Sequence, residues 1–334
     1  MTEHIGRINL ALQGGGAHGA FSWGVLDRLL EEPSLEIEGI SGASAGAMNA
    51  ACVAFGLVQG GNEQARAVLD KFWSAVAVPA APVSDWFSYF KREGDLPGFG
   101  AALVKLSQSF SPYQLNPFNV NPLKAMLGAA VDIECIAKCE YPKLFIAATE
   151  VQSGRLRVFR NSELSTDVFL ASACLPSLHH AVNIDGVSYW DGGFSANPPL
   201  TPLVFDCESD DIVLIMLEPM EEEQAPKSSH DIRHRTAALN FSTPLHTELR
   251  VIEEMQAHAK HDKAKNDCLS SRLQSMRIQM IEDGGFLGGL HKRSRINTQR
   301  DFLSALKAQG RLTAEQWLEA RKSKGSTEQQ LAPS

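Results

Sequence analysis

The stretch GISGASAGAMNAACVAF runs from Gly39 to Phe55 and places Ser44 between very small side chains, Gly42, Ala43, Ala45 and Gly46. A serine on a tight turn between a strand and a helix needs such neighbours, because larger side chains would collide with the two elements that meet there. The positive end of the helix would also favour an alkoxide-like state of the hydroxyl. The pattern predicts a nucleophile elbow at Ser44. A serine that only caps the helix is the alternative interpretation.

Two strand–turn–helix units follow one another at the start of the chain. Apolar residues at 8–12 and 36–40 predict buried strands, and helical spacing of apolar residues predicts helices over 17–31 and 44–58. Units of this kind pack as a parallel sheet covered by helices, so the sequence predicts an α/β fold.

The rest of the chain continues with further elements of both kinds. We expect strands at 143–148, 156–159, 187–190, 211–217 and 277–281, and helices at 62–76, 166–173 and 244–265. Residues 221–229 resemble a surface loop. We expect residues 8–205 to form the core that carries all motifs, and residues 206–321 to supply a remaining strand and helices packed on it. Residues 322–334 are expected to be a polar, frayed tail.

The composition is that of an ordinary globular protein. Of the 334 residues, 44% are hydrophobic and 21% charged, which is enough for a full core. The formal net charge of −8 argues against a nucleic-acid-binding protein, which usually carries a basic face. The six cysteines form no CxxC pair and are expected to be reduced thiols. No apolar run of about 18 residues and no signal-peptide pattern is found, so we expect a cytoplasmic protein, with peripheral membrane contact left open.

A glycine-rich loop, Gly14-Gly-Gly-Ala-His-Gly19, follows the first strand and opens the first helix. Consecutive glycines let the backbone turn sharply and leave N–H groups facing outward beside a helix N-terminus, which is a site for an anion. A dinucleotide pyrophosphate and the oxyanion of a tetrahedral intermediate both fit this loop. Because parallel strands end at the same edge, we expect this loop and the Ser44 turn to lie side by side.

No histidine is an evident candidate for the base that would accept the proton of Ser44. The chain has ten histidines, and none of those after Ser44 stands in an evident catalytic pattern. Asp191 does stand in such a pattern. It ends the strand at 187–190 and precedes Gly192 and Gly193, which permit a tight turn. A plain turn aspartate is the alternative.

The three motifs GGGAHG (14–19), GASAG (42–46) and DGG (191–193), in this order, resemble the patatin-like phospholipase family. A fourth block, Ala171-Ser-Ala-Cys-Leu-Pro176, resembles the family's segment between the nucleophile and the aspartate. The resemblance covers roughly residues 8–205. It implies a three-layer α/β/α fold with a mostly parallel central sheet.

The resemblance also implies roles for the motif residues. Ser44 would be the nucleophile and Asp191 its base, with the N–H groups of Gly14, Gly15 and Gly16 as the oxyanion hole. The remaining implied site residues line the same loop and turn or give the motifs their shape: Ala17, His18, Gly19, Ala45, Gly42, Gly46, Gly192 and Gly193. The family hydrolyses acyl esters of phospholipids and related lipids, like phospholipases A and lysophospholipases, and needs no metal or cofactor. It usually has Arg or Lys where this chain has His18.

Two other functions are kept as alternatives. A dinucleotide-binding protein could use the Gly14–Gly19 loop, but it would want an acidic residue at the end of the second strand, where this chain has glycine and serine. The second alternative function is that of a catalytically silent lipid-binding module. Weaker candidate sites are the pairs His179–His180 and His258–His261, and the aromatic residues Trp86, Phe87, Tyr89 and Phe90, which would suit a lid or a membrane contact.

Overall fold

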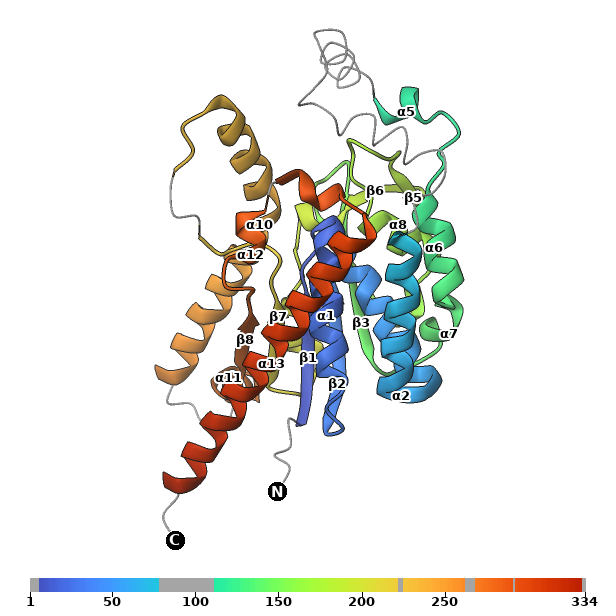
Figure 1. Cartoon of the computed structure of the whole chain (residues 1–334). Helices are drawn as coiled ribbons and strands as arrows, with labels where there is room; N and C mark the ends of the chain where they lie inside the picture. Colours follow the sequence, from blue (N-terminus) through green and yellow to red (C-terminus); the bar gives the residue numbers. More distant parts are fainter. Residues whose placement is uncertain (1–5, 78–110, 222–224, 262–267, 291, 332–334) are drawn as a thin grey trace.

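The fold is a mixed, mostly parallel sheet with helices on both faces, as the sequence predicts (Figure 1). The computed structural model describes residues 6–77, 111–221, 225–261, 268–290 and 292–331. Within these residues the sheet has eight strands in the pairing order β5-β6-β3-β2-β1-β7-β8, and β4 also pairs with β3. The strands are β1 (Gly6–Leu12), β2 (Leu35–Gly42), β3 (Lys143–Glu150), β4 (Leu156–Phe159), β5 (Val182–Ile184), β6 (Val187–Asp191), β7 (Asp211–Ile215) and β8 (Arg277–Ile281).

The first two strands end together, as expected. β1 and β2 are parallel, and Leu12 at the end of β1 is paired with Gly42 at the end of β2. The loop after β1 and the Ser44 turn after β2 therefore leave the sheet at the same edge. β7 and β8 extend the parallel part beyond β1, whereas β4, β5 and β6 are antiparallel to their partners.

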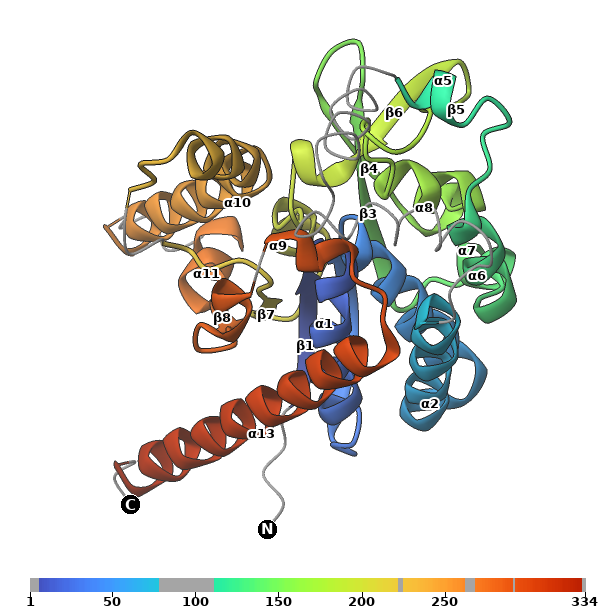
Figure 2. The ribbon, with the colours of Figure 1, turned by 45° about the horizontal axis from the view of Figure 1, so that its top comes forward.

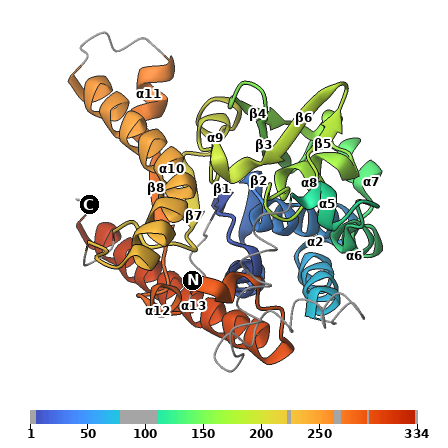
Figure 3. The same ribbon diagram turned by 90° about the horizontal axis from the view of Figure 1, so that it is seen from above.

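Two groups of helices cover the two faces of the sheet (Figure 3). One face packs on α1 (Gly19–Leu29), α2 (Ala45–Ala77), α6 (Pro122–Ala130), α7 (Ile133–Ala137), α8 (Thr166–Ser172) and α13 (Arg300–Leu331). The other packs on α9 (Thr201–Asp206), α10 (Ser229–His261) and α11 (Cys268–Ser275). Short elements complete the chain: η1 (Gly16–His18), α5 (Pro112–Leu115), η2 (Asn161–Glu163), η3 (Gly192–Phe194), α12 (Phe286–Gly289) and η4 (Lys292–Ile296).

The predicted elements are confirmed within a few residues, with two corrections. The helix expected from 244 begins at Ser229 instead, because Pro244 lies inside α10 rather than at its first turn. The expected frayed tail is wrong for residues 322–331, since the backbone of α13 stays helical to Leu331. The segment contains lysine, glutamate and glutamine, which are good helix formers. The helices expected at 44–58 and 62–76 are joined as α2, with non-helical backbone at Gly60 and Gly61.

Helix α13 lies directly against α1 and extends the core beyond the motifs (Figure 2). Two glycines allow the close approach. A Cβ on Gly24 of α1 would collide with the carbonyl oxygen of Lys307, and one on Gly310 of α13 would collide with that of Phe21. Main chain therefore packs on main chain at this crossing.

We expect Gly310→Ala to destabilise the protein by about 1–3 kcal/mol, because the new methyl group would overpack this crossing. Gly128→Ala in α6 is the matched control, since nothing lies within 4 Å of the added Cβ. That change should be neutral or stabilise by about 0.4–1 kcal/mol. Denaturant unfolding of both variants measures the difference. Equal stabilities would contradict the close packing of α13 on α1.

Candidate active site

Ser44 lies on the tight turn between β2 and α2. Its φ of 54° is in the left-handed region, which is strained for a residue with a side chain. Its N–H lies 3.1 Å from both the carbonyl oxygen and the Oγ of Ser172, so the end of α8 supports the turn. A Cβ on Gly42 would lie 2.7 Å from the carbonyl carbon of Gly46, and one on Gly46 would collide with the carbonyl oxygen of Leu12. The turn therefore requires its two glycines.

The carboxyl of Asp191 is brought to this turn by strand β3. Ile146 pairs with Gly42 of β2 and also with β4, so β2 and β4 lie on opposite edges of β3. Ala148 pairs with β4 and with Asp191, so β6 lies on the same edge as β2. Two residues of a strand span about 7 Å. Asp191 therefore occupies the edge of β3 just beyond the end of β2, where the chain turns away through Ser44.

The environment of Asp191 is closed to solvent, with an exposed fraction of 0%. Its N–H donates to the carbonyl oxygen of Cys174 at 2.9 Å, and its Oδ1 accepts the N–H of Gly193 at 2.8 Å. Burial raises the pKa of Asp191 to about 7, against the opposing effects of the Gly193 N–H and the Ser44 hydroxyl. Oδ2 is buried and, in the part of the chain that the structure describes, makes no hydrogen bond of ordinary geometry. The carboxyl is therefore expected to exchange its proton near neutral pH, and the Ser44 hydroxyl is one of the groups that act on it.

The glycine loop lies against Ser44. A Cβ on Gly14 would lie 2.7 Å from the Cβ of Ser44. The N–H of Gly14 donates to Oδ1 of Asn197 at 2.7 Å, so this group is already engaged. The N–H groups of Gly15 and Gly16 have no acceptor among the described residues, and Gly16 has a φ of 60°. Gly15 and Gly16 therefore offer the free donors of this loop.

His18 is buried directly after these glycines. Its Nε2 lies 2.7 Å from Oγ of Ser294, which belongs to η4. Burial and the positive charge of Arg295 lower the pKa of His18 to about 4. The imidazole is therefore neutral at pH 7, and the charge next to the loop comes from Arg295 instead.

The other predicted site residues lie in the glycine loop, in the Ser44 turn or in the turn after Asp191. Gly19 packs against Ala45, the residue after Ser44, and its carbonyl oxygen accepts a hydrogen bond from Asn49 at 3.0 Å. Ala17 is buried in the turn η1. Gly192 and Gly193 form η3, where a Cβ on Gly193 would collide with the ring of Phe241 from α10.

Sequence reasoning missed the residues that hold the motifs in place. Asn197, Ser172 and Cys174 each hydrogen-bond to a predicted site residue, yet none stands in a recognisable pattern of its own. Ser172 and Cys174 do fall in the block 171–176 that resembles the family. Their partners could be identified only from the folded chain.

His180, one of the weaker candidates, makes its contacts with the segment around α5. The ring of His180 stacks on Tyr113 and its Nε2 lies 3.2 Å from the carbonyl oxygen of Pro112. The aromatic residues 86–90 and the side chain of His261 lie outside the described residues. Over the part of the chain that the structure describes, no group of three or more His, Cys, Asp or Glu side chains could hold a metal ion. Within the same residues, no helix is long and apolar enough to cross a membrane.

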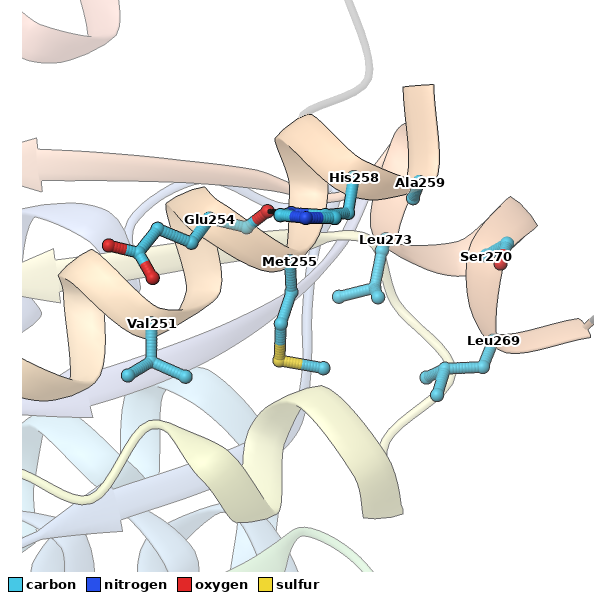
Figure 4. Close-up of a pocket in the computed structure, with 8 residues that line it drawn as sticks. All are labelled: Val251, Glu254, Met255, His258, Ala259, Leu269, Ser270 and Leu273. Carbon is cyan, nitrogen blue, oxygen red and sulfur yellow. Dashed lines mark hydrogen bonds between the residues drawn. The ribbon is translucent and has the colours of Figure 1, made fainter. Parts of the chain in front are cut away.

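Two grooves lie along α10. One, of about 660 Å³, is lined by apolar residues of α10 and α11 such as Met255 and Leu273, and His258 lies at its side with Nδ1 2.9 Å from the carbonyl oxygen of Glu254 (Figure 4). It contains no motif residue. The second, of about 570 Å³, borders the Asp191 turn through Phe194 and Ser195.

Comparison with known proteins identifies the fold that builds this cluster. The family model for patatin-like phospholipases matches residues 10–204, more than half of the chain. The chain belongs to this family. A crystal structure of VipD from Legionella pneumophila is similar, with 15% sequence identity and a TM-score of 0.40 over 90% of this chain and 66% of that chain. This chain thus spans about two thirds of the length of VipD. No curated protein sequence matches it.

Membership in this family confirms the expected three-layer α/β/α architecture. The description of the family as patatin-like phospholipases agrees with the expectation of a lipid acyl hydrolase. The matched segment ends before α9 is complete, and β7, β8 and α10 to α13 lie beyond it.

The raised pKa of Asp191 leads to a stability prediction. A carboxyl with a higher pKa in the folded chain stabilises the fold below its unfolded pKa, and this contribution is lost as the pH rises through about 7. We therefore expect the stability of Asp191→Asn relative to the native protein to increase by about 2–3 kcal/mol between pH 5 and pH 8. Urea unfolding at the two pH values measures it.

Asp185→Asn is the matched control for this experiment, since Asp185 is exposed and its positive φ is one that asparagine tolerates. Its relative stability should change little between the two pH values. If the stability of Asp191→Asn relative to the native protein were also the same at both pH values, the raised pKa of Asp191 would be contradicted.

Proposed function

We propose that the protein hydrolyses lipid acyl esters by a Ser44–Asp191 dyad. The observation that carries this proposal is the placement of a buried carboxyl with a pKa of about 7 on the edge of β3 next to the Ser44 turn. A serine hydroxyl needs a base within reach to become a nucleophile, and a base works best with a pKa near the working pH. Asp191 meets both conditions without a histidine.

In this proposal the reaction has two halves. Ser44 attacks the ester carbonyl while Asp191 accepts its proton, and the alcohol leaves with a proton from Asp191. Water then hydrolyses the acyl-enzyme with Asp191 as base again. The N–H groups of Gly15 and Gly16, assisted by that of Ala45 and the N-terminus of α2, stabilise the negative charge that develops on the carbonyl oxygen.

The substrate class follows from the family and the site together. Phospholipids and lysophospholipids carry the acyl esters that this chemistry cleaves, so we propose phospholipase A or lysophospholipase activity. Ser44 and Asp191 also separate this function from the alternative of a silent lipid-binding module, which would need neither the strained serine nor the buried carboxyl.

The decisive experiment is labelling with a fluorophosphonate, which reacts with an activated serine. We expect the native protein to be labelled and to hydrolyse short-chain esters, and Ser44→Ala to lose both properties. Asp191→Asn should lose nearly as much activity, and the double variant should be scarcely worse, because the two residues act as a unit. Since only the carboxylate form of Asp191 is a base, the rate should rise about tenfold from pH 6 to pH 8.

Replacement of histidines is the control for the dyad. His246→Gln and His258→Gln should retain full labelling, since neither belongs to the cluster at Ser44. Label retained by Ser44→Ala would overturn the nucleophile. A histidine variant that folds but forms no acyl-enzyme would replace the dyad with a triad.

We further propose that the protein contacts lipid surfaces from the cytoplasmic side through the α5 surface, defined as Tyr113, Leu115, Phe118 and Val120. All four are exposed, and Phe118 reaches 89%. The segment 112–131 has no acidic residue and only one charged one, Lys124. Exposed aromatic and aliphatic side chains of low charge suit the interface of a membrane.

The α5 surface is connected to the proposed dyad by a short series of contacts. Asp191 donates to Cys174, the Cys174 thiol donates to the carbonyl oxygen of His180 at 3.0 Å, and the His180 ring stacks on Tyr113 with centroids 4.0 Å apart. Figure 1 shows α5 at the end of the molecule toward which β1 and β2 run. A lipid surface bound there would lie on the side of the sheet where Ser44 stands.

We expect Leu115→Ser with Phe118→Ser to reduce hydrolysis of phospholipid vesicles severalfold and to leave soluble short-chain esters unaffected. Leu312→Ser is the matched control, because Leu312 is half exposed, at 52%, but lies on α13. Vesicle co-sedimentation gives the binding directly. Unchanged vesicle binding by the double variant would contradict a lipid contact at α5.

A further inference from the structure

The C-terminal segment η4 contacts the glycine loop although it begins 88 residues beyond the segment that matches the family, which ends at 204. A Cβ on Gly16 would collide with the main-chain oxygen of Arg295, so the main chain of η4 lies directly on the loop. Next to it, Ser294 meets the Nε2 of His18 at 2.7 Å. Figure 2 shows this part of the chain, just before α13, passing over the N-terminal end of α1. The glycine loop is therefore covered by residues that do not belong to any of the motifs.

The other end of the loop is fixed to the chain that follows β7. Oε1 of Gln13 accepts the N–H groups of Leu217 at 2.6 Å and Glu218 at 3.0 Å. The N–H of Gln13 donates to the carbonyl oxygen of Ile215. Gln13 immediately precedes Gly14, so the start of the glycine loop cannot move without the residues after β7.

An ion pair joins these two supports. Nη2 of Arg295 lies 2.6 Å from Oε1 of Glu218, whose side chain is buried, with an exposed fraction of 7%. A carboxylate in such a place favours a close cationic partner strongly, because desolvation makes the loss of that partner costly. Through this pair, Gln13, Glu218, Arg295 and Gly16 form a closed ring of contacts around the glycine loop.

We propose that Glu218 and Arg295 are positioning residues that hold the N–H groups of Gly15 and Gly16 in place for the oxyanion. This inference rests on the proposed function. Donors aimed at a developing charge are effective only when they are fixed before the reaction, and small misplacements of such groups reduce the rate strongly. The charge of Arg295 also acts on His18, which places the guanidinium within electrostatic reach of the loop.

The experiment compares Arg295→Ala with Arg295→Lys on a soluble short-chain ester. The alanine variant keeps the main chain that covers Gly16 but removes the ion pair with Glu218. We expect kcat to fall about tenfold or more with KM changed less than about twofold, because the loop donors act in the transition state rather than in substrate binding. Arg295→Lys keeps the charge and should recover most of kcat.

Arg311→Ala is the matched control. Arg311 has the same exposed fraction of its side chain, 34%, and its guanidinium also pairs with a buried carboxylate, Asp27, and with Glu31 at 2.9 Å. It fixes α13 to the core at the other end of α1 and does not contact the glycine loop. We expect its kcat to stay within about twofold of the native value, because its partners Asp27 and Glu31 lie at the C-terminal end of α1, away from the glycine loop. An equal loss of kcat in both variants would mean general docking of the C-terminal part and would overturn the proposal.

Hydrogen exchange of the peptide that spans residues 13–20 gives a readout independent of activity. We expect faster exchange there in Arg295→Ala and native exchange in Arg311→Ala. Unchanged exchange with unchanged kcat in Arg295→Ala overturns the positioning role while Ser44-dependent hydrolysis by the native protein still stands. If the native protein shows no Ser44-dependent hydrolysis, the proposed function fails, and the exchange data alone decide whether the pair positions the loop.

Discussion

The edge of β3 is the constraint on which the site depends. One edge of this strand pairs first with β2 and then, two residues later, with β6. This change of partner is made where β2 ends and its chain turns through Ser44 into α2. The antiparallel β6 then fills the vacant edge and delivers Asp191. In this fold, the carboxyl therefore reaches the Ser44 turn on a strand that is antiparallel to β3.

Burial of Asp191 has a cost that its neighbours only partly offset. The carboxyl has one firm donor, the N–H of Gly193, and its Oδ2 is buried without a hydrogen bond of ordinary geometry in the described structure. An isolated carboxylate in such a place would be protonated, and the pKa of about 7 expresses this balance. A pKa near neutral pH would suit the role of base that we propose for Asp191.

The C-terminal third is more than an appendage to the motif-bearing core. α13 packs on α1 through Gly24 and Gly310 with main chains in contact. Asp27 of α1 is bound by Arg66 of α2 and by Arg311 of α13, so one buried carboxylate joins three helices. η4 then covers the glycine loop. The boundary expected at residue 205 therefore marks where the motifs end. Residues on its two sides pack on each other at several places.

The sequence by itself determined every described strand except β5, the helices α1, α2 and α8, part of α10, and the three motifs, because period, glycine and proline act locally along the chain. It predicted that the glycine loop and Ser44 share an edge, since both follow parallel strands. It could not show that Pro244 lies inside a helix, that Gly14 donates to Asn197, or that Arg295 lies beside His18. These contacts join residues far apart in the chain, and only the packing of helices and the pairing along β3 bring them together. The pKa of Asp191 belongs to the same class, because burial is a property of the fold and not of the residue.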